Sequence, residues 1–240
     1  MAFDPHRYST NGLLAAIPPS DLENLAPQLE LVEVTIRDRI GEPGQTTEFC
    51  YLPLSGLFST VAMFERDNSV EAGLVGREGC VGVWIALLSD RSPFLLISQA
   101  SGRALRLPAP QFRHACETMP PFRSAVLRFA HTFMVQMAST VLANSSYTIE
   151  ERLARWILMC HDRLDVFSFS MTHDFMALML AVRRPSVTEA VHALESRHLV
   201  RATRGNMQVL DRHGLEALAG ASYGHAEDEY RRLIAPAELN

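Results

Sequence analysis

Two adjacent arginines, Arg183 and Arg184, stand directly before a proline and an apolar helical pattern in AVRRPSVTEAVHAL (181–194). A guanidinium carries a planar set of N–H donors that matches phosphate oxygens or the O6/N7 edge of guanine. Pro185 suits the first turn of a helix, because its missing N–H would have no intrahelical partner there. The segment therefore predicts a helix whose amino-terminal end carries groups able to bind nucleic acid.

Two amphipathic helices are predicted around this proline. The spacing i, i+3, i+4, i+7 places apolar side chains on one helix face. That spacing occurs twice, in Phe175, Leu178, Met179 and Val182 and again in Val187, Ala190, Val191 and Leu194. At about 3.6 residues per turn, burial of the second face turns four side chains outward: Pro185, Glu189, His192 and Ser196.

A short β-hairpin is predicted directly after the second helix. The segment HLVRATRGNMQVLD (198–211) alternates around Arg204-Gly205-Asn206, a hairpin turn signal. Upstream, Thr172 is a suitable N-cap and Asp174 is favourable in the first turn of the first helix. Two short helices followed by a two-stranded wing are typical of a winged helix, whose second helix enters the major groove.

The charge of the chain limits how it can bind nucleic acid. The 240 residues carry a formal net charge of −5, which argues against general coating of nucleic acid but permits a local basic face. Over 171–212, six arginines and four acidic residues leave a net charge of +2. All 22 basic residues of the chain are arginines, so every basic contact to an anion would use a guanidinium.

The sequence argues against an enzyme and against a metal site. Its cysteines are scattered without ligand spacing and are typical of small buried hydrophobes in a reducing compartment. No nucleophile–base signature is found and no cofactor is evident. With no apolar run of ~18 residues and no signal-peptide pattern, we expect a cytoplasmic protein without a membrane span. The four cysteines are Cys50, Cys80, Cys116 and Cys160.

The amino-terminal half is predicted to be an antiparallel β domain, and the rest of the chain is predicted to be helical. Short apolar runs alternate with Gly, Pro, Asp and Ser, as in a sandwich or barrel. A helix is expected at 111–117, and Thr148 with Glu151 forms a capping box at the start of another helix. The apolar face of that helix is predicted to be Leu153, Trp156, Ile157 and Cys160. The strand-like runs are 29–36, 49–54, 57–64, 94–100 and 104–108.

Two apolar stripes run along the long helix predicted over 122–142. A helix with two apolar faces has two surfaces to pack against. Either it is a buried core helix, or one face packs on the β domain and a heptad seam pairs with a second copy of the chain. The face toward the β domain would be Val126, Phe129 and Phe133. The seam would be Leu127, Ala130, Met134, Met137 and Val141.

Together these patterns resemble the Crp/Fnr family of bacterial transcription regulators. The likeness is carried by TIEERLARWIL (148–158), MTHDFMALMLAVRRPSVTEAVHALE (171–195) and GREGCVG (76–82). It implies a homodimer that binds palindromic double-stranded DNA through a recognition helix over 185–197, with RNA polymerase as a partner. It also implies an α+β fold in three parts. Residues 1–117 would form an antiparallel, jelly-roll-like β-roll sensor domain with short amino-terminal helices. Residues 118–147 would form a dimerisation helix and hinge, and residues 148–240 a winged helix-turn-helix DNA-binding domain.

The family's base-reading positions fall on Arg184, Pro185 and Glu189. Arg184 keeps the arginine and can bind guanine, Pro185 replaces a carboxylate, and Glu189 replaces an arginine and can accept from cytosine N4. The operator should therefore differ from those of the best-known members. Phosphate contacts, which position the protein without reading sequence, are predicted for Thr172, Arg183, Ser186 and Thr188. Each has an alternative role, as a helix cap for Thr172 and as a solvent-facing residue for the other three.

The sensor half departs further from the family pattern. The family's cyclic-nucleotide cassette resembles the stretch from Gly82 to Arg91-Ser92, whose Arg-Ser pair would hold a cyclic phosphate. The ribose-binding glutamate falls on Val83, which cannot accept a hydrogen bond. We therefore expect no cyclic AMP binding in the usual way, an unknown small-molecule effector, and Arg91-Ser92 in a turn between strands. An alternative reading is a small-ligand-binding module whose helix-turn-helix serves protein interaction.

Overall fold

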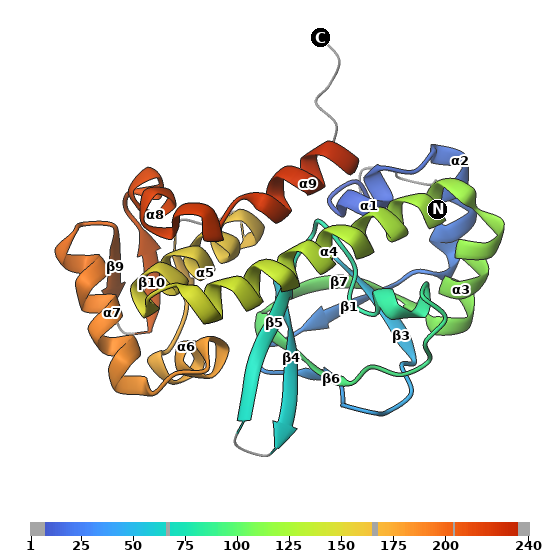
Figure 1. The fold of residues 1–240 in the computed structure, drawn as a ribbon. Coiled ribbons are helices and arrows are strands. Elements are labelled where there is room, and N and C mark those ends of the chain that lie inside the picture. The colour runs from blue at the N-terminus through green and yellow to red at the C-terminus, as the bar shows by residue number, and fades with distance from the viewer. Residues whose placement is uncertain (1–7, 66–67, 165–167, 204, 235–240) are drawn as a thin grey trace, which may run out of the picture.

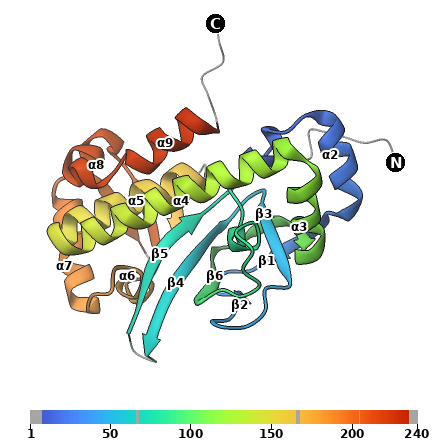
Figure 2. The same ribbon diagram turned by 45° about the vertical axis from the view of Figure 1, so that its right-hand side comes forward.

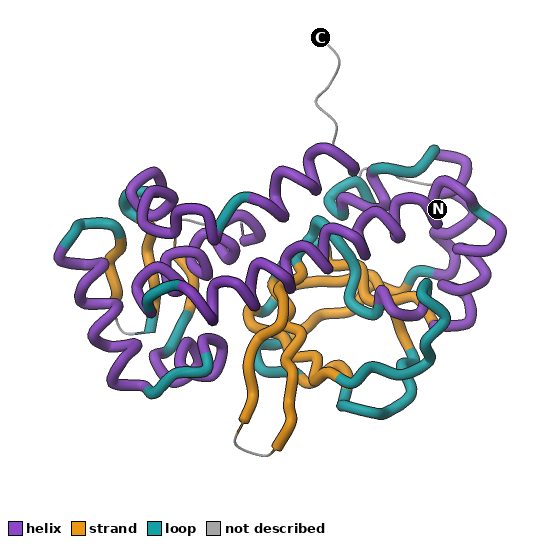
Figure 3. Tube along the Cα trace, in the orientation of Figure 1, coloured by secondary structure: helices purple, strands orange, loops and turns teal. Residues whose placement is uncertain are grey.

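The computed structural model describes residues 8–65, 68–164, 168–203 and 205–234. It confirms an α+β architecture, with a β-rich amino-terminal half and a helical carboxy-terminal half (Figure 1). Figure 3 shows strands in only two places, the amino-terminal half and a small sheet beside the carboxy-terminal helices. One long helix, α4 (Pro120–Ser146), runs along both halves.

Two antiparallel sheets form the amino-terminal half. One has the order β1-β7-β3 and the other β2-β6-β4-β5. Leu52, Phe58 and Leu105 are fully buried in the core that they share with helices at one end of the roll. The strands are β1 (Glu30–Val34), β2 (Arg39–Gly41), β3 (Phe49–Pro53), β4 (Leu57–Glu65), β5 (Asn68–Val75), β6 (Phe94–Ala100) and β7 (Gly102–Pro108).

Short helices close the ends of this roll. Phe112 of α3 packs edge-on against Phe122 of α4, with ring centroids 5.5 Å apart. Asn11 caps the first helix and donates to the carbonyls of Pro53 and Gly79, which fixes the amino-terminal segment to the roll. The helices are α1 (Gly12–Ala15), α2 (Pro19–Leu25), η2 (Ala26–Gln28), η3 (Val83–Ile85) and α3 (Ala109–Thr118).

Helix α4 buries one of its predicted apolar stripes and leaves part of the other open. Val126, Phe129 and Phe133 are buried against the roll, as the sequence predicts. In the seam, Ala130 is buried and Met137 packs against the same core, because both lie next to the buried stripe at the helical period. Leu127, Met134 and Val141 remain 42%, 56% and 69% exposed. The open apolar stripe thus repeats every seven residues.

By length and composition α4 could also cross a membrane, and 39% of its most apolar 18-residue window is buried inside the fold. One helix of this kind is weak evidence, because the core helix of a soluble protein passes the same test.

The carboxy-terminal half begins at the predicted capping box. The Thr148 N–H donates to Glu151 Oε2 at 2.7 Å, and the Glu151 N–H donates to Thr148 Oγ1 at 3.4 Å. All four residues of the predicted apolar face on the next helix are buried. The elements are α5 (Ile149–Leu164), β8 (Ser168–Ser170), α6 (His173–Leu180), α7 (Arg184–Ser196), β9 (Val200–Thr203), β10 (Asn206–Val209), α8 (Arg212–Ala219), η4 (Gly220–Ser222) and α9 (His225–Leu233).

The two halves pack closely. Figures 1 and 2 show α9 lying along α4, where His131 Nε2 is 2.8 Å from Glu229 Oε1. On another side, α5 and α6 pack against the four-stranded sheet. Leu57, Leu74 and Leu95 of that sheet belong to the same buried cluster as the core of the carboxy-terminal half. Each half therefore completes its core with residues of the other.

Candidate nucleic-acid interface

Helix α7 exposes the face that the sequence predicts. Its buried side is Val187, Ala190, Val191 and Leu194, while Glu189, His192 and Ser196 are exposed. The helix begins at Arg184, with Pro185 in its first turn and Arg183 as the N-cap residue. Figure 1 shows α7 at the end of the molecule farthest from α2 and α3, so its outer face is open to a partner.

The buried face of α6 differs from the predicted one. Met176, Met179 and Leu180 are buried, whereas Leu178 is 40% exposed. The helix ends at Leu180, and Ala181 follows with φ of 51° in the left-handed region, so Val182 lies beyond the helix. Helix α6 also packs on the β4–β5 side of the sheet. The residues of α6 that this contact buries differ from those that packing against α7 alone would bury. Contacts from another part of the chain thus override the local pattern.

Arg184 forms an ion pair with Asp174 in the first turn of α6. The Nε atom of Arg184 lies 3.1 Å from Oδ1 of Asp174, and the two side chains are 65% and 76% exposed. Exposed pairs of this kind contribute about 0–1 kcal/mol. The ion pair therefore orients the guanidinium, and breaking it to bind a partner costs little free energy. Sequence reasoning placed Asp174 at a helix start and gave no signal for this pairing.

Thr188 joins the same two helices. Its hydroxyl donates to the Arg184 carbonyl at 3.2 Å and lies 2.9 Å from His173 Nδ1. Because a hydroxyl has one proton, both bonds form together when His173 Nδ1–H is the second donor. Thr188 is half-buried. Its hydroxyl is therefore occupied by contacts inside the helix-turn-helix.

The other predicted phosphate contacts gather at the same edge. Thr172 is exposed and its hydroxyl accepts from the Phe175 N–H at 3.3 Å, as an N-cap does. Ser186 is half-buried in the first turn of α7, and Arg183, the N-cap residue of that helix, is exposed. The first turns of α6 and α7 thus lie side by side and present two arginines and two hydroxyl side chains.

A β-hairpin lies beside this edge. Strands β9 and β10 pair in antiparallel register, and β8 adds a third strand that its three residues gave no reason to predict. Gly205 has φ of 80°, a left-handed conformation that favours glycine. A Cβ atom at Gly205 would lie 3.9 Å from Thr172 Cγ2, so the wing turn is next to the start of α6. Arg204 of the predicted turn lies outside the described residues.

The predicted effector residues lie in the segment between β5 and β6. Gly82 begins η3 with φ of 106°, and Arg91 is exposed at a bridge to Thr46. Ser92 is buried, and its hydroxyl accepts from the Phe94 N–H at 3.0 Å. Of these three residues, only Ser92 lines the 350 Å³ cavity at this end of the roll.

The residues beside this cassette are apolar or already hydrogen-bonded. Val83, at the family's ribose-binding position, is buried. The indole of Trp84 donates to Thr47 Oγ1 at 2.8 Å, which fixes the ring against the β2–β3 loop. This corner of the roll therefore offers no carboxylate from the position where the family carries one.

The four cysteines are all buried, as expected, and free. Burial raises the pKa of Cys116 to about 12 and also raises the pKa values of Cys50 and Cys160 well above the ordinary value. For Cys50 the neighbouring Cys80 adds to the effect. These three side chains are therefore thiols at neutral pH, and thiols are poor nucleophiles and metal ligands. Within the described residues, no group of three or more His, Cys, Asp or Glu could hold a metal ion.

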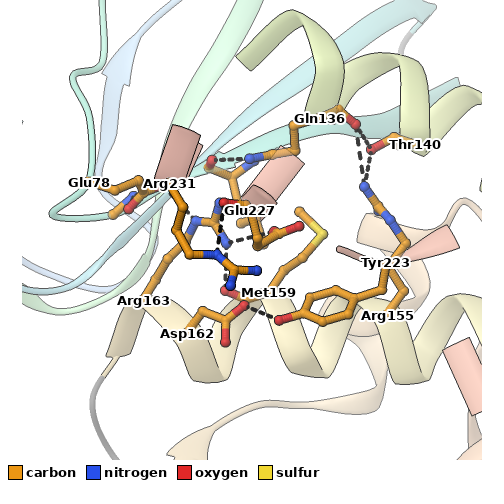
Figure 4. Close-up of polar contacts among 12 residues, drawn as sticks. Glu78, Gln136, Thr140, Arg155, Met159, Asp162, Arg163, Tyr223, Glu227 and Arg231 are labelled. Atoms are coloured by element: carbon orange, nitrogen blue, oxygen red, sulfur yellow. Dashed lines mark hydrogen bonds and ion pairs between the residues drawn. The ribbon is translucent and has the colours of Figure 1, made fainter. Parts of the chain in front are cut away.

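A second cavity, of about 560 Å³, lies between the two halves, and Figure 4 shows the polar residues around it. Arg163 of α5 is buried and donates to Glu78 Oε1 at 2.7 Å, while Glu227 lies 3.9 Å away. Tyr223 donates to Asp162 at 2.6 Å. Glu78 belongs to the GREGCVG stretch, and its carboxylate also accepts from the Gly76 N–H. This stretch thus fastens the β-roll to α5.

Comparisons with known proteins agree with this architecture. Residues 151–218 match the family model described as the Crp-like helix-turn-helix domain. A comparison with curated protein sequences found no match. Among solved structures, FixK2 from Bradyrhizobium japonicum is 12% identical with a TM-score of 0.70, and the alignment covers 80% of this chain and 98% of that one.

Two further solved structures share the fold. The c-di-GMP-responsive global regulator CLP of Xanthomonas campestris is 13% identical with a TM-score of 0.66, covering 80% of this chain and 99% of that one. A CRP-family transcriptional regulator from Thermus thermophilus is 18% identical with a TM-score of 0.64, covering 79% and 96%. Residues 151–218 therefore form a Crp-like helix-turn-helix domain, in a chain that has the overall fold of Crp/Fnr family regulators.

Proposed function

We propose that this chain is a DNA-binding transcriptional regulator without catalytic activity. The observation that carries the proposal is the edge formed by the first turns of α6 and α7, where Arg183 and Arg184 are exposed beside Thr172 and the wing. Guanidinium groups at a helix start beside a wing suit contacts to both phosphates and base edges. The structural relatives include proteins described as a global regulator and a transcriptional regulator.

The exposed residues of α7 suggest which bases are read. Arg184 is placed to bind guanine O6 and N7, and Glu189 is placed to accept from cytosine N4. Pro185 offers no side-chain hydrogen bond, so the base at its position would be read weakly. Arg183, Ser186 and Thr172 are assigned to phosphate contacts. Thr188 is a weaker candidate because its hydroxyl is already bonded to His173 and Arg184.

The functional unit in this proposal is a homodimer. Leu127, Met134 and Val141 form an open apolar stripe along α4, and a second copy would cover it through a two-fold axis. Two recognition helices related by that axis would read the two halves of a palindromic operator. RNA polymerase is the further partner through which the bound dimer would alter transcription. We place the protein in the cytoplasm, where the DNA and the polymerase are found.

We propose that the β-roll senses a small molecule. It would not bind cyclic AMP in the way that is usual for the family. Val83 offers no acceptor for a ribose hydroxyl, Ser92 already bonds to its own turn, and Arg91 is exposed. The effector is therefore a ligand that does not need that carboxylate. We propose no resident cofactor or metal.

Selection of duplexes from a random pool by the full chain tests the DNA-binding function. The selected sequence should be an inverted repeat, and its affinity should fall steeply as salt rises from about 50 to 200 mM, because phosphate contacts release counterions. The alternative is a ligand-binding module whose helix-turn-helix serves protein interaction. Recovery of no enriched sequence, with weak binding that is equal for all duplexes, would favour that alternative.

A further inference from the structure

Glu71 of β5 is a buried carboxyl group at the contact between the two halves. It is 5% exposed and receives hydrogen bonds from both sides. From the sheet, Ser59 Oγ donates to Glu71 Oε2 at 2.6 Å, and the Gln99 amide also donates to Oε2. From α5, the Trp156 indole donates to Glu71 Oε1 at 2.9 Å. The carboxyl group therefore joins the β-roll directly to the carboxy-terminal half.

The surroundings of Glu71 are otherwise apolar. The Sδ atom of Met179, from α6, lies 3.0 Å from the Gln99 amide nitrogen. Trp156 and Met179 belong to one buried cluster with Leu57 and Leu74 of the sheet. This cluster exists only while α5 and α6 cover the sheet. We call Ser59, Glu71, Gln99, Trp156 and Met179 the Glu71 cluster.

Few charged groups face this carboxyl group. Arg155, on α5, attracts it, but the guanidinium bonds instead to the carbonyls of Ser222 and Gln136 and to Thr140 Oγ1. Cys160, also on α5, is an un-ionised thiol whose pKa is raised partly by Glu71. Strands β4 and β6 and helix α6 contribute the neutral groups Ser59, Gln99 and Met179. Among the described residues, Glu71 thus has hydrogen-bond donors but no ion-pair partner.

Both protonation states of Glu71 fit the cluster. Three donors satisfy the ionised carboxylate, and in the neutral form the Ser59 hydroxyl can turn and accept the carboxyl proton. Burial raises the pKa of Glu71 from about 4.5 to about 7, and the hydrogen bonds from Ser59, Trp156 and Gln99 oppose that rise. Separation of the halves would return the carboxyl group to water and its pKa toward the ordinary value.

We propose that the Glu71 cluster makes the docking of the carboxy-terminal half on the β-roll depend on protons, with neutral Glu71 favouring the docked arrangement. The docked state keeps the Glu71 proton up to about pH 7, and the separated state loses it near pH 4.5. Docking is therefore strongest below pH 4.5, weakens as pH rises from there to the folded pKa of about 7, and no longer changes above it, where both states are ionised. The full change is on the order of 100-fold in the docking equilibrium.

A change in docking would act on the helix-turn-helix through α6. The same helix carries Met179 in the Glu71 cluster and Asp174 against Arg184 of α7. Release of α6 from the sheet would free the helix-turn-helix to reorient relative to α4. That consequence for DNA rests on the proposed function, whereas the docking equilibrium itself does not.

Hydrogen exchange of the full chain between about pH 5.5 and 8.5, corrected for the intrinsic rate, tests the proposal without DNA. Peptides covering β4 and α6 should lose protection as pH rises from about 5.5 to about 7 and then level off, because Glu71 is ionised in both states above the folded pKa. Glu71→Gln should abolish that dependence and stay protected throughout. Glu78→Gln is the matched control, because it removes another β-roll carboxylate that bonds to α5 and should leave the pH at which protection levels off unchanged.

Two results would overturn the proposal. One is equal protection of the wild-type peptides at all pH values, and the other is the wild-type pH profile in Glu71→Gln. Trp156→Phe supplies a separate measurement if Glu71→Gln does not fold. It removes a hydrogen bond that lowers the Glu71 pKa, so the pH at which protection levels off should move higher. An unchanged levelling-off pH in Trp156→Phe would contradict the role of Glu71.

Discussion

The guanidinium of Arg184 lies 3.1 Å from the carboxylate of Asp174, so the first turns of α6 and α7 are joined at the edge proposed to meet DNA. Both side chains are largely exposed, and a guanine or phosphate can replace the carboxylate at small cost. The ion pair gives the free protein a defined position for the side chain that would read a base. It also places one negative charge at the interface.

Replacement of Arg184 by alanine should weaken specific DNA binding by about 1–3 kcal/mol and relax the preference at one base step. The reason is loss of a bidentate contact to guanine. Affinities for the selected duplex and its single-base variants measure both effects. Asp174→Asn is the companion variant, since it keeps the guanidinium and removes only the carboxylate charge. It should retain the base preference; unchanged discrimination in Arg184→Ala would remove Arg184 from the readout.

Replacement of Met134 by glutamate should convert the proposed dimer into a monomer. Met134 is the centre of the open stripe on α4, and a buried carboxylate there would face an apolar partner surface. Sedimentation measures the change. Leu88→Glu is the control, because Leu88 is also an exposed apolar residue but follows η3 and is not part of the open stripe on α4. A Met134→Glu chain that still sediments as a dimer would place the dimer contact elsewhere.

Replacement of Glu78 by alanine should lower the free energy of unfolding by about 3 kcal/mol, because it leaves the buried Arg163 guanidinium without its nearest partner. Glu227, 3.9 Å away, compensates only in part. Urea unfolding provides the measurement. Glu42→Ala breaks the exposed pair with Arg39 and should change stability by less than about 1 kcal/mol. Equal effects of the two substitutions would contradict the importance of burial.

Replacement of Gly79 by alanine should destabilise the fold by about 1–3 kcal/mol. A Cβ atom at Gly79 would lie 2.0 Å from the Phe129 ring, so α4 could not approach the loop as closely. Thermal unfolding of Gly79→Ala, Phe129→Leu and the double variant tests this. The smaller side chain in Phe129→Leu should make the double variant more stable than the sum of the single changes. Strict additivity would indicate that the two residues do not compete for space.

Local patterns predicted the parts of this molecule that local interactions control. The Thr148–Glu151 capping box, the buried face of α5 and the buried face of α7 all follow from short-range spacing, and the structure contains them. The stripe that α4 buries against the roll was predicted in the same way. In each case the apolar residues predicted from the helical period are among those that the core buries.

Features that depend on contacts between separate elements could not be predicted. Helix α6 buries Met176 and Leu180 because the sheet covers a side that the helix alone does not indicate. Glu71 lies in a strand, where the sequence alone suggests that a charged side chain faces solvent. In the structure, α5 and α6 cover it. The Asp174–Arg184 pair joins residues ten positions apart across a turn. The periodicity of a single helix or strand does not indicate contacts of this kind.

Only Tyr147 and Thr148 separate the end of α4 from the start of α5. With two soft backbone angles per residue, this joint has about four degrees of freedom. The stripe that would define a two-fold axis ends at Val141, just before the joint, and α7 follows beyond it. In the proposed dimer, the distance between the two recognition helices would depend on the torsion of these two residues and on how the carboxy-terminal half docks on the β-roll, so the spacing between operator half-sites would report on both.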